Sequence, residues 1–304
     1  MRHEPAYEGR PLVRPGEEVV DQGLGFDITT LMSRRRMLRA LGLGAAAAGL
    51  AACASNPGTS SGSTSATTTA SGTGLVEIPD ETAGPYPGDG SNGPNVLAES
   101  GIVRSDIRSS FGGASGTADG VPLTIRLTIL DIANGGSAFA GAAVYVWHCN
   151  REGGYSMYSS AIEDQNYLRG VQIADSSGRV SFISIFPACY SGRWPHIHFE
   201  VYPDQAGITD ASNAIATSQI ALPQDVCEAV YAQPGYEPSV GNLAQVSLTT
   251  DNVFGDDGGV HELGAVTGDA SGYTVSLTAP VDTTTTPTGG SAPAGGPGGP
   301  PPSR

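Results

Sequence analysis

Short runs of alternating or β-branched residues, separated by clusters of Gly, Asp, Asn and Pro, dominate the chain from residue 121 onward. These runs disfavour long helices. The content of Gly 43 and Pro 22 among 304 residues also favours turns and β-structure over long helices. We therefore predict an all-β fold, a single β-sandwich domain, in which only Asp225 to Ala232 is helical. The predicted strands lie within residues 121–131, 141–149, 170–174, 179–186, 194–202, 215–222, 244–250 and 272–279.

The N-terminal residues 1–52 differ in composition from the predicted domain. Three consecutive arginines, Arg34 to Arg36, precede an uncharged apolar run at 40–50, a pattern that resembles a twin-arginine export signal. The run is followed by Cys53 in a context similar to a bacterial lipoprotein box, so we expect cleavage before Cys53 and lipidation of its thiol. An ordinary signal with an incidental Cys53 is the alternative. The protein is thus expected to be exported and lipid-anchored at the outer face of the cell membrane.

Two further segments are of low complexity. Residues 53–74 are nearly all Ser, Thr, Gly and Ala and are expected to form a flexible tether, and residues 281–304, rich in Thr, Pro and Gly, a disordered tail. The apolar run at 40–50 is shorter than the roughly 20 residues of a transmembrane helix, so we expect membrane contact only through the lipid. Residues 75–280 remain for one domain with a sizeable core.

The charges of the chain exclude several functions. Lys+Arg 15 stand against Asp+Glu 30, all fifteen cations are Arg, and the net charge is −15. A lysine nucleophile and a P-loop lysine are therefore excluded. The acidic balance also disfavours nucleic acid as a partner, because neutralising phosphates requires clustered cations.

A His-x-His pair in the predicted strand 194–202 is the strongest candidate for chemistry. In a strand, His196 and His198 point to one face and Ile197 and Phe199 to the other, with the two histidine Cα atoms about 6.6 Å apart. The two imidazoles can therefore bind one metal ion, whereas Glu200 lies about 13 Å from His196 along the strand. Two solvated or hydrogen-bonded histidines are the alternative. An Fe(II) site of two histidines and a carboxylate would need an Asp or Glu from another strand.

The cysteines do not indicate a thiolate metal site. Cys149, Cys189 and Cys227 are scattered, with no Cys-x-x-Cys spacing. In an exported protein we expect one disulfide and one spare thiol among them, with the pairing left open.

Tyrosines supply the remaining candidate ligands, Tyr190 upstream of the histidines and Tyr155 after a Gly-rich turn. Together with the histidines they give a pattern that resembles the intradiol ring-cleavage dioxygenases, in which two tyrosinates and two histidines hold a non-haem Fe(III). Three further segments are similar to that family: Thr82 to Tyr86, Tyr167 to Gly170 and Thr217 to Gln219. The pattern runs through Trp147, Tyr155, Tyr190, Arg193, His196 and His198.

The resemblance implies a function and a role for each site residue. One Fe(III) per chain would be held by Tyr155, Tyr190, His196 and His198, with Tyr158 the competitor for the place of Tyr155. The substrates would be catechols and O2, and the products muconate-type diacids. Homodimer formation is left open. Catalytic roles would fall to Arg193, Tyr190 and Gln219, and the substrate pocket would be walled by Pro85, Tyr86 and Trp194.

Structural interpretations of several of these residues remain as alternatives. Arg193 could form a surface salt bridge and Gln219 could be a structural amide, while His148 and His261 are expected to be structural. The chain as a whole could instead be a non-catalytic, tethered β-sandwich binding module, or a different metallo-oxidase built on the His-x-His pair.

Overall fold

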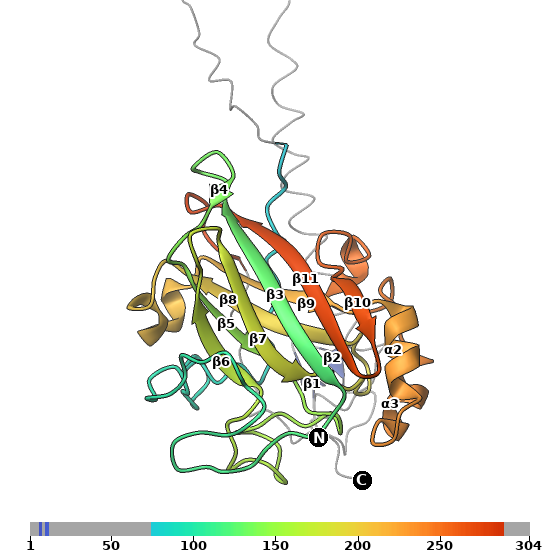
Figure 1. Ribbon diagram of the computed structural model, residues 1–304. Helices are drawn as coiled ribbons and strands as arrows, with labels where there is room; N and C mark the ends of the chain where they lie inside the picture. Colours follow the sequence, from blue (N-terminus) through green and yellow to red (C-terminus); the bar gives the residue numbers. More distant parts are fainter. Residues whose placement is uncertain (1–5, 8–9, 12–73, 289–304) are drawn as a thin grey trace, which may run out of the picture. The chain divides into compact units, whose positions relative to one another are not determined.

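The structure is a computed structural model that describes residues 6–7, 10–11 and 74–288 (Figure 1). The chain divides into two units, and the described part of the first is a short antiparallel pair, β1 (Ala6–Tyr7) and β2 (Arg10–Pro11). Apart from this pair, the predicted export signal, Cys53 and the tether up to residue 73 lie outside the described residues. Everything below concerns the second unit.

A five-stranded sheet forms one layer of the second unit. Its main path runs β10 (Ala265–Asp269), β11 (Gly272–Val281), β3 (Pro122–Asp131), β4 (Ser137–Ala138), and β7 (Arg179–Ile185) also pairs with β3. The β11 and β3 strands are parallel, and the other pairs are antiparallel. One face of this sheet is buried and the other is exposed, because the apolar residues of β3 alternate with Thr and Arg along the strand.

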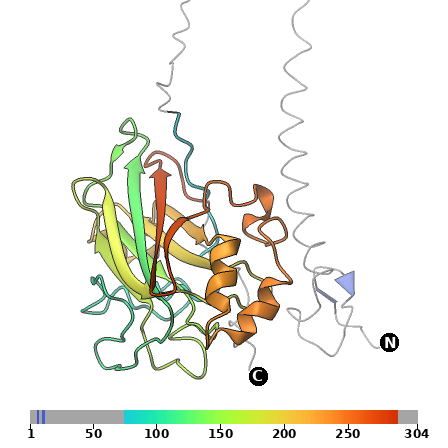
Figure 2. The same cartoon turned by 45° about the vertical axis from the view of Figure 1, so that its right-hand side comes forward.

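A four-stranded antiparallel sheet forms the second layer. Its order is β6 (Arg169–Ile173), β5 (Ala143–Trp147), β8 (His196–Tyr202) and β9 (Ala216–Ala221). Every residue of β5, β8 and β9 is buried, so this sheet is covered on both faces. The two layers are visible in Figures 1 and 2.

The main core fills the space between the sheets. Inward-facing side chains of β3 and β7, such as Ile125 and Phe182, meet those of β5 and β8, such as Val146 and Phe199. On the other face of the four-stranded sheet, Tyr145 and Trp147 pack under connecting segments that contribute Ala83, Val96, Leu97 and Tyr155. This second, loop-covered cluster is the part of the fold that contains the candidate site.

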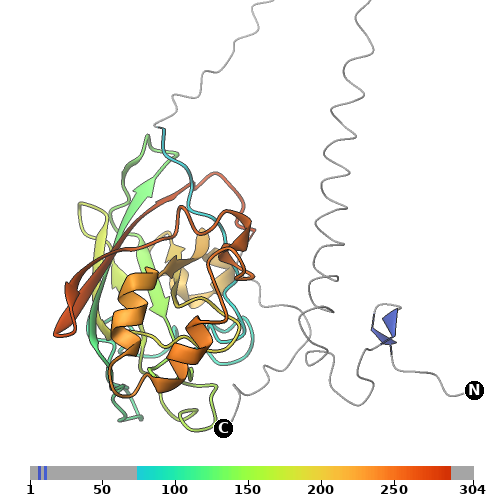
Figure 3. The same cartoon turned by 90° about the vertical axis from the view of Figure 1, so that its right-hand side faces the viewer.

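Helices are few among the described residues. The α-helices α2 (Gln224–Tyr231) and α3 (Glu237–Leu243) follow β9 in the sequence and lie side by side in Figure 3. Three short 3-10 turns are also present, two of them between β8 and β9. The turns are η2 (Gly207–Thr209), η3 (Ala211–Asn213) and η4 (Phe254–Asp256). Among the described residues, no helix combines the length and the apolar character that crossing a membrane requires.

Most of the predicted strands and the predicted helix are confirmed, and one strand is wrong. Residues 244–250 do not form a strand: α3 ends at Leu243, and turns follow. The apolar residues Leu243, Val246 and Leu248 instead pack against a small buried cluster around Phe254. The sequence also did not predict β4, β10 or α3. Beyond residue 280 the backbone continues in β11 to Val281, and Thr288 donates a backbone hydrogen bond to Asp80.

The expected disulfide is absent from the structure. Cys149, Cys189 and Cys227 are all buried free thiols. The Sγ of Cys149 lies 3.6 Å from the carbonyl oxygen of Ala188, and the Sγ of Cys189 lies 3.5 Å from that of Arg193. Burial raises the pKa of both thiols to about 12, so they are unreactive at neutral pH. The cysteines fill the core instead of cross-linking it.

Glu262 generates a prediction for the pH dependence of stability. Its carboxyl is fully buried, with one oxygen unpaired, and burial together with Glu81, Asp257 and Asp256 raises its pKa to about 9. The native state therefore keeps a proton that the unfolded chain releases above its ordinary pKa, so Glu262 lowers the free energy of unfolding as the pH rises towards 9. We expect Glu262→Gln to remove a dependence of up to about 1.4 kcal/mol per pH unit.

Urea unfolding at pH 5, 7 and 8 measures this effect. The gain in stability of Glu262→Gln over the wild type should grow with pH, whereas exposed Glu163→Gln should give no such trend. Parallel pH profiles for Glu262→Gln and the wild type would contradict the burial of a protonated carboxyl.

Candidate metal centre

Strand β8 places the two histidines as the alternation predicted. Ile197, Phe199 and Val201 enter the core between the sheets, and His196 and His198 lie on the opposite face. That face is not solvated, because connecting segments cover it and each histidine is only 2% exposed. The solvated form of the alternative is therefore wrong, whereas a hydrogen bond does hold the ring of His196.

Two tyrosines reach the histidines from connections between strands. Tyr155 follows a turn in which the side-chain oxygen of Asn150 accepts a hydrogen bond from the backbone N–H of Gly154 at 2.7 Å. Gly153 in this turn has a φ of +89°, and a Cβ there would lie 3.2 Å from the Cβ of Tyr190. The glycine thus allows both the turn and the close approach of the two tyrosine segments.

The donor atoms of these side chains converge. The Nε2 atoms of His196 and His198 are 3.1 Å apart, and the Nε2 of His196 lies 3.4 Å from the Oη of Tyr155 and 3.3 Å from the Oη of Tyr190. The two phenol oxygens are 3.5 Å apart. Ligand atoms about 2.0–2.1 Å from a common metal ion are separated by roughly 3.0–3.4 Å, so the spacing suits one coordination sphere.

Tyr158, the competing candidate, points elsewhere. Its Oη accepts a hydrogen bond from the backbone N–H of Gly88 at 2.9 Å and donates one to Asn92 at 2.8 Å. Tyr155 is therefore the tyrosine that joins Tyr190 and the histidines.

Neighbouring groups fix both imidazole rings. The Nδ1 of His196 lies 2.5 Å from the carbonyl oxygen of Trp194, and an acceptor there keeps the proton on Nδ1 and leaves the Nε2 lone pair free for a metal. The ring of His198 stacks on Trp147 at 4.8 Å, with 4° between the planes. A Cβ on Gly84, whose φ is +69°, would lie 3.4 Å from His198, so this glycine allows the loop to pack on the ring.

The protonation of the four groups suits a bound cation. Burial, followed by the Arg193 charge, lowers the pKa of His196 to about 3, and burial lowers the pKa of His198 well below its usual value, so both are neutral ligands. Burial raises the pKa of Tyr190 to about 12 and raises the pKa of Tyr155 well above its usual value. The phenols are therefore protonated in the apoprotein, and a highly charged metal ion would be needed to ionise them.

The chemistry of the donors narrows the kind of metal. Among the described residues, no group of three or more His, Cys, Asp or Glu side chains could hold a metal ion. An ion bound here would thus depend on the two tyrosines in addition to the histidines. Phenolate oxygen is a hard anionic ligand, so the set fits a trivalent ion such as Fe(III), and it does not supply the carboxylate of a two-histidine Fe(II) site.

Arg193 and Gln219 lie beside this centre in a hydrogen-bonded chain. The guanidinium of Arg193 donates to Oδ2 of Asp251 at 3.0 Å and to Oε1 of Gln219 at 2.7 Å, and Gln219 donates to the carbonyl oxygen of Thr82 at 2.9 Å. The side chains of this salt bridge are 13% and 0% exposed, so the alternative interpretation of Arg193 as one half of a surface salt bridge is wrong. Burial acts against the charged form of Asp251, but Arg193 and backbone N–H groups hold its pKa below the usual value.

The three residues expected to line the substrate pocket lie in two different places in the structure. The ring of Tyr86 lies 5.0 Å from that of Tyr155, and Pro85 is an exposed neighbour in the same loop. The prediction that Trp194 lines the pocket is wrong. Its indole is buried in the cluster with Val253 and Phe254 and donates to the carbonyl oxygen of Leu222. Trp194 contributes to the centre through its carbonyl and not as a pocket wall.

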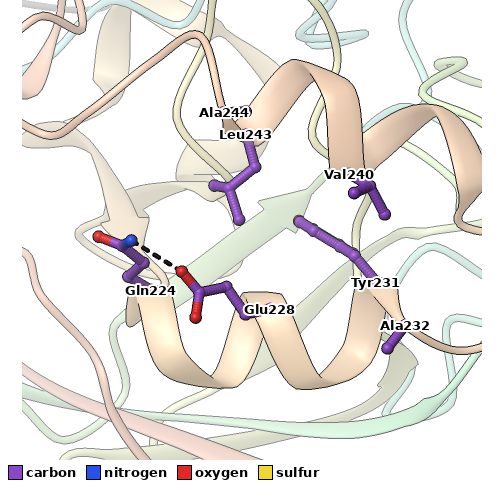
Figure 4. Close-up of a pocket in the computed structure, with 7 residues that line it drawn as sticks. All are labelled: Gln224, Glu228, Tyr231, Ala232, Val240, Leu243 and Ala244. Atoms are coloured by element: carbon purple, nitrogen blue, oxygen red, sulfur yellow. Dashed lines mark hydrogen bonds between the residues drawn. The ribbon is translucent and has the colours of Figure 1, made fainter.

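Other residues that the sequence singled out are structural or exposed. The ring nitrogens of His148 lie 2.8 Å from the carbonyl of Cys149 and 2.7 Å from Ser184, whereas His261 is exposed. A separate hollow of about 390 Å³ between α2 and α3 contains none of the candidate ligands (Figure 4). Its lining is Gln224, Glu228, Tyr231, Ala232, Val240, Leu243 and Ala244.

Sequence reasoning missed Asp251, and it named Arg169 only as part of the segment Tyr167 to Gly170, without a structural role. Arg169 is 1% exposed and donates to the carbonyl oxygens of Tyr86, Pro87 and Ser156. It thereby joins the loop beside Tyr155 to the segment that follows Tyr155. Only the Asx-type capping pattern after Asp251 could have indicated the first residue, and nothing in the sequence identified the partners of either.

Comparisons with known proteins find similarity to dioxygenases. The sequence model of a family described as dioxygenase matches residues 92–208, a range that includes both tyrosines and both histidines of the centre. A chlorocatechol 1,2-dioxygenase of Rhodococcus opacus is 40% identical over 55 residues, 18% of this chain and 21% of that protein. A catechol 1,2-dioxygenase of a Pseudomonas species is 36% identical over 72 residues, 24% of this chain and 23% of that protein. The matches thus span about a fifth of these relatives.

The fold itself is similar to solved dioxygenase structures. An intradiol ring-cleavage dioxygenase from Tetranychus urticae superposes with a TM-score of 0.54 at 21% identity, covering 69% of this chain and 96% of that one. A second dioxygenase structure, Tetur07g02040, gives a TM-score of 0.52 at 21% identity with the same coverage. The β-sandwich described above is therefore the fold of this class of dioxygenase.

The position of Tyr155 gives a prediction for metal binding. We expect Tyr155→Phe to retain iron at least about tenfold more weakly than the wild type, because it removes a converging oxygen from a buried site. Tyr158→Phe, a change of the same kind three residues away, should leave iron retention unchanged because its hydroxyl is bound to Asn92. Elemental analysis after dialysis against a chelator measures both variants, and equal iron loss would contradict the assignment.

Proposed function

We propose that the protein is an intradiol dioxygenase, which uses O2 to cleave catecholic rings between the two hydroxyls and forms muconate-type diacids. The observation that carries the proposal is the convergence of two phenol oxygens and two imidazole nitrogens within 3.1–3.5 Å of their neighbours. The match to the dioxygenase family over the segment that contains these residues supports it.

The proposed cofactor is one non-haem Fe(III), held by Tyr155, Tyr190, His196 and His198. When bound, the iron would supply the Lewis acidity that lets a catechol bind as its dianion and become reactive towards O2. The buried, neutral imidazoles and the two ionisable phenols fit this role, because they compensate the ion's charge without a carboxylate.

The two tyrosines differ in a way that suggests different roles. Tyr155 is 2% exposed, and its backbone N–H donates to Ser159 at 2.8 Å, whereas Tyr190 is only half-buried in the connection between β7 and β8. Tyr190 is thus the ligand better placed to leave the centre and to take a proton from an incoming catechol hydroxyl on its Oη.

Arg193 and Gln219 would stabilise negative charge on the substrate. Arg193 has five N–H donors, of which Asp251 and Gln219 engage two, and the others have no partner among the described residues. A fixed cation at this place favours electron-rich states of a bound ring. Gln219 is held between Arg193 and the carbonyl oxygen of Thr82, which fixes the orientation of its amide.

The aromatic loop of Pro85 and Tyr86 would limit access to the centre. The ring of Tyr86 lies 5.0 Å from that of Tyr155 and 5.2 Å from that of Tyr158. The guanidinium of Arg169 donates to two carbonyl oxygens of the loop. We propose that this loop contacts the ring of the substrate and excludes water from it.

The location of the enzyme is also a proposal. The arginines before residue 40 and Cys53 support export by the twin-arginine route and a lipid anchor at the outer face of the membrane. Catechols outside the cell would then be the substrates. Mass spectrometry of the N-terminal fragment from the membrane fraction tests the anchor directly.

Two measurements test the proposed activity. Iron-loaded protein should be coloured by phenolate-to-iron charge transfer, and it should consume O2 with at least one of catechol, protocatechuate and hydroxyquinol while forming a diacid. A colourless iron-loaded sample would contradict the tyrosinate centre. Coloured protein without O2 uptake on any catechol would contradict the activity and favour a binding module.

Tyr190→Phe should separate metal binding from substrate binding. We expect a changed colour and a loss of about 100-fold in kcat/KM, because the variant lacks a ligand that can leave and accept a proton. Tyr273→Phe, which changes a buried core tyrosine, serves as the control and should keep both values. Unchanged colour and kinetics in Tyr190→Phe would contradict its assignment.

A further inference from the structure

Asp251 has an unusual concentration of hydrogen bonds for a residue outside the centre. Its side chain is fully buried and accepts from the Nε of Arg193 at 3.0 Å and from the backbone N–H of Trp194 at 2.6 Å, both on Oδ2. Its other oxygen, Oδ1, accepts from the backbone N–H groups of Val253 at 2.8 Å and Phe254 at 3.2 Å. One carboxylate thus carries four hydrogen bonds.

The two oxygens of Asp251 have separate tasks. Oδ1 caps the turn that begins η4, a local role that many Asp, Asn and Ser residues fulfil. Oδ2 acts across 57 and 58 residues of sequence, on Trp194 and Arg193, which lie between the candidate ligands Tyr190 and His196. The hydrogen bonds of Oδ2 are not needed for the turn at η4, because Oδ1 alone caps that turn.

Both residues that Oδ2 binds are hydrogen-bonded to residues of the candidate metal centre. The guanidinium of Arg193 continues to Gln219, and the carbonyl of Trp194 accepts the Nδ1 hydrogen bond of His196. A carboxylate that fixes Arg193 and the backbone of Trp194 together therefore sets the position of the cation and the orientation of one metal ligand.

We propose that Asp251 is a positioning residue of the centre, which holds the Arg193 guanidinium beside the substrate and the Trp194 carbonyl behind His196. The inference rests on the proposed ring-cleavage function and extends it to a residue that lies outside the matched family segment. Without the carboxylate, Arg193 loses its charged partner and keeps only the hydrogen bond to Gln219, so its guanidinium can rotate away from the reacting ring although all four metal ligands remain.

Two substitutions separate positioning from capping. Asp251→Asn retains an oxygen for the turn but presents an N–H group to Arg193 and Trp194, and Asp251→Ser keeps a shorter cap without the charge. We expect iron content close to that of the wild type, kcat lowered about 10- to 100-fold with a smaller change in KM, and a shifted visible band of the catechol complex.

Asp131→Asn is the matched control. Asp131 is also buried and accepts hydrogen bonds from the backbone and side chain of Asn134, but it does so at the end of β3. This variant should lose stability without a change in kcat, KM or the visible band. If Asp251→Asn melts like Asp131→Asn and keeps the wild-type kcat and band, Asp251 is only a structural cap and the proposal is wrong.

A third variant covers the case in which Asp251→Asn and Asp251→Ser do not fold. Asp251→Glu keeps the charge and displaces it by one methylene, so a kcat loss with retained iron supports positioning and a wild-type kcat and band overturn it. Failure of the proposed function has a different signature, since the wild type itself would then consume no O2 with any catechol.

Discussion

Burial of strand β8 on both faces is the constraint on which the centre depends. Ile197 and Phe199 secure one face in the core, and the loop-covered cluster around Trp147 and Tyr155 closes the other. The same burial gives the histidines low pKa values and the tyrosines high ones, so the apoprotein holds four neutral groups. A polar set with this spacing in an apolar surrounding is stable only if its members satisfy one another or share a cation.

The loops that complete the centre lie outside the two sheets, so buried side chains serve as anchors that hold much of their backbone in place. Arg169 supplies one, since a single buried guanidinium binds the carbonyls of Tyr86, Pro87 and Ser156. Asp251 supplies another, because its carboxylate binds the guanidinium of Arg193. In both places a charged side chain makes several hydrogen bonds to a loop. Such charge-assisted hydrogen bonds are stronger than neutral ones, and they restrict the position of the loop.

The alternation of β8 and the short β-branched runs were enough to predict the sandwich and the convergence of the two histidines. The Gly-rich turn and the spacing of the resembled family favoured Tyr155 over Tyr158. The physical reason lies in contacts that the sequence does not show, the Asn150 turn and the partners of Tyr158 at Gly88 and Asn92. Asp251 was not predictable, since its partner Arg193 is 58 residues away. Trp194 was misplaced because its neighbours come from the turns after α3, which the pattern had suggested as a strand.

The free thiols have a consequence for where the domain can mature. Because Cys149, Cys189 and Cys227 are buried without cross-links, the described domain needs no oxidising compartment or disulfide isomerase to reach its native state. It can therefore fold in a reducing compartment. Export by the twin-arginine route, proposed above, requires a protein that folds before it is transported. The thiol interior is thus compatible with the proposed export route, in which folding precedes transport.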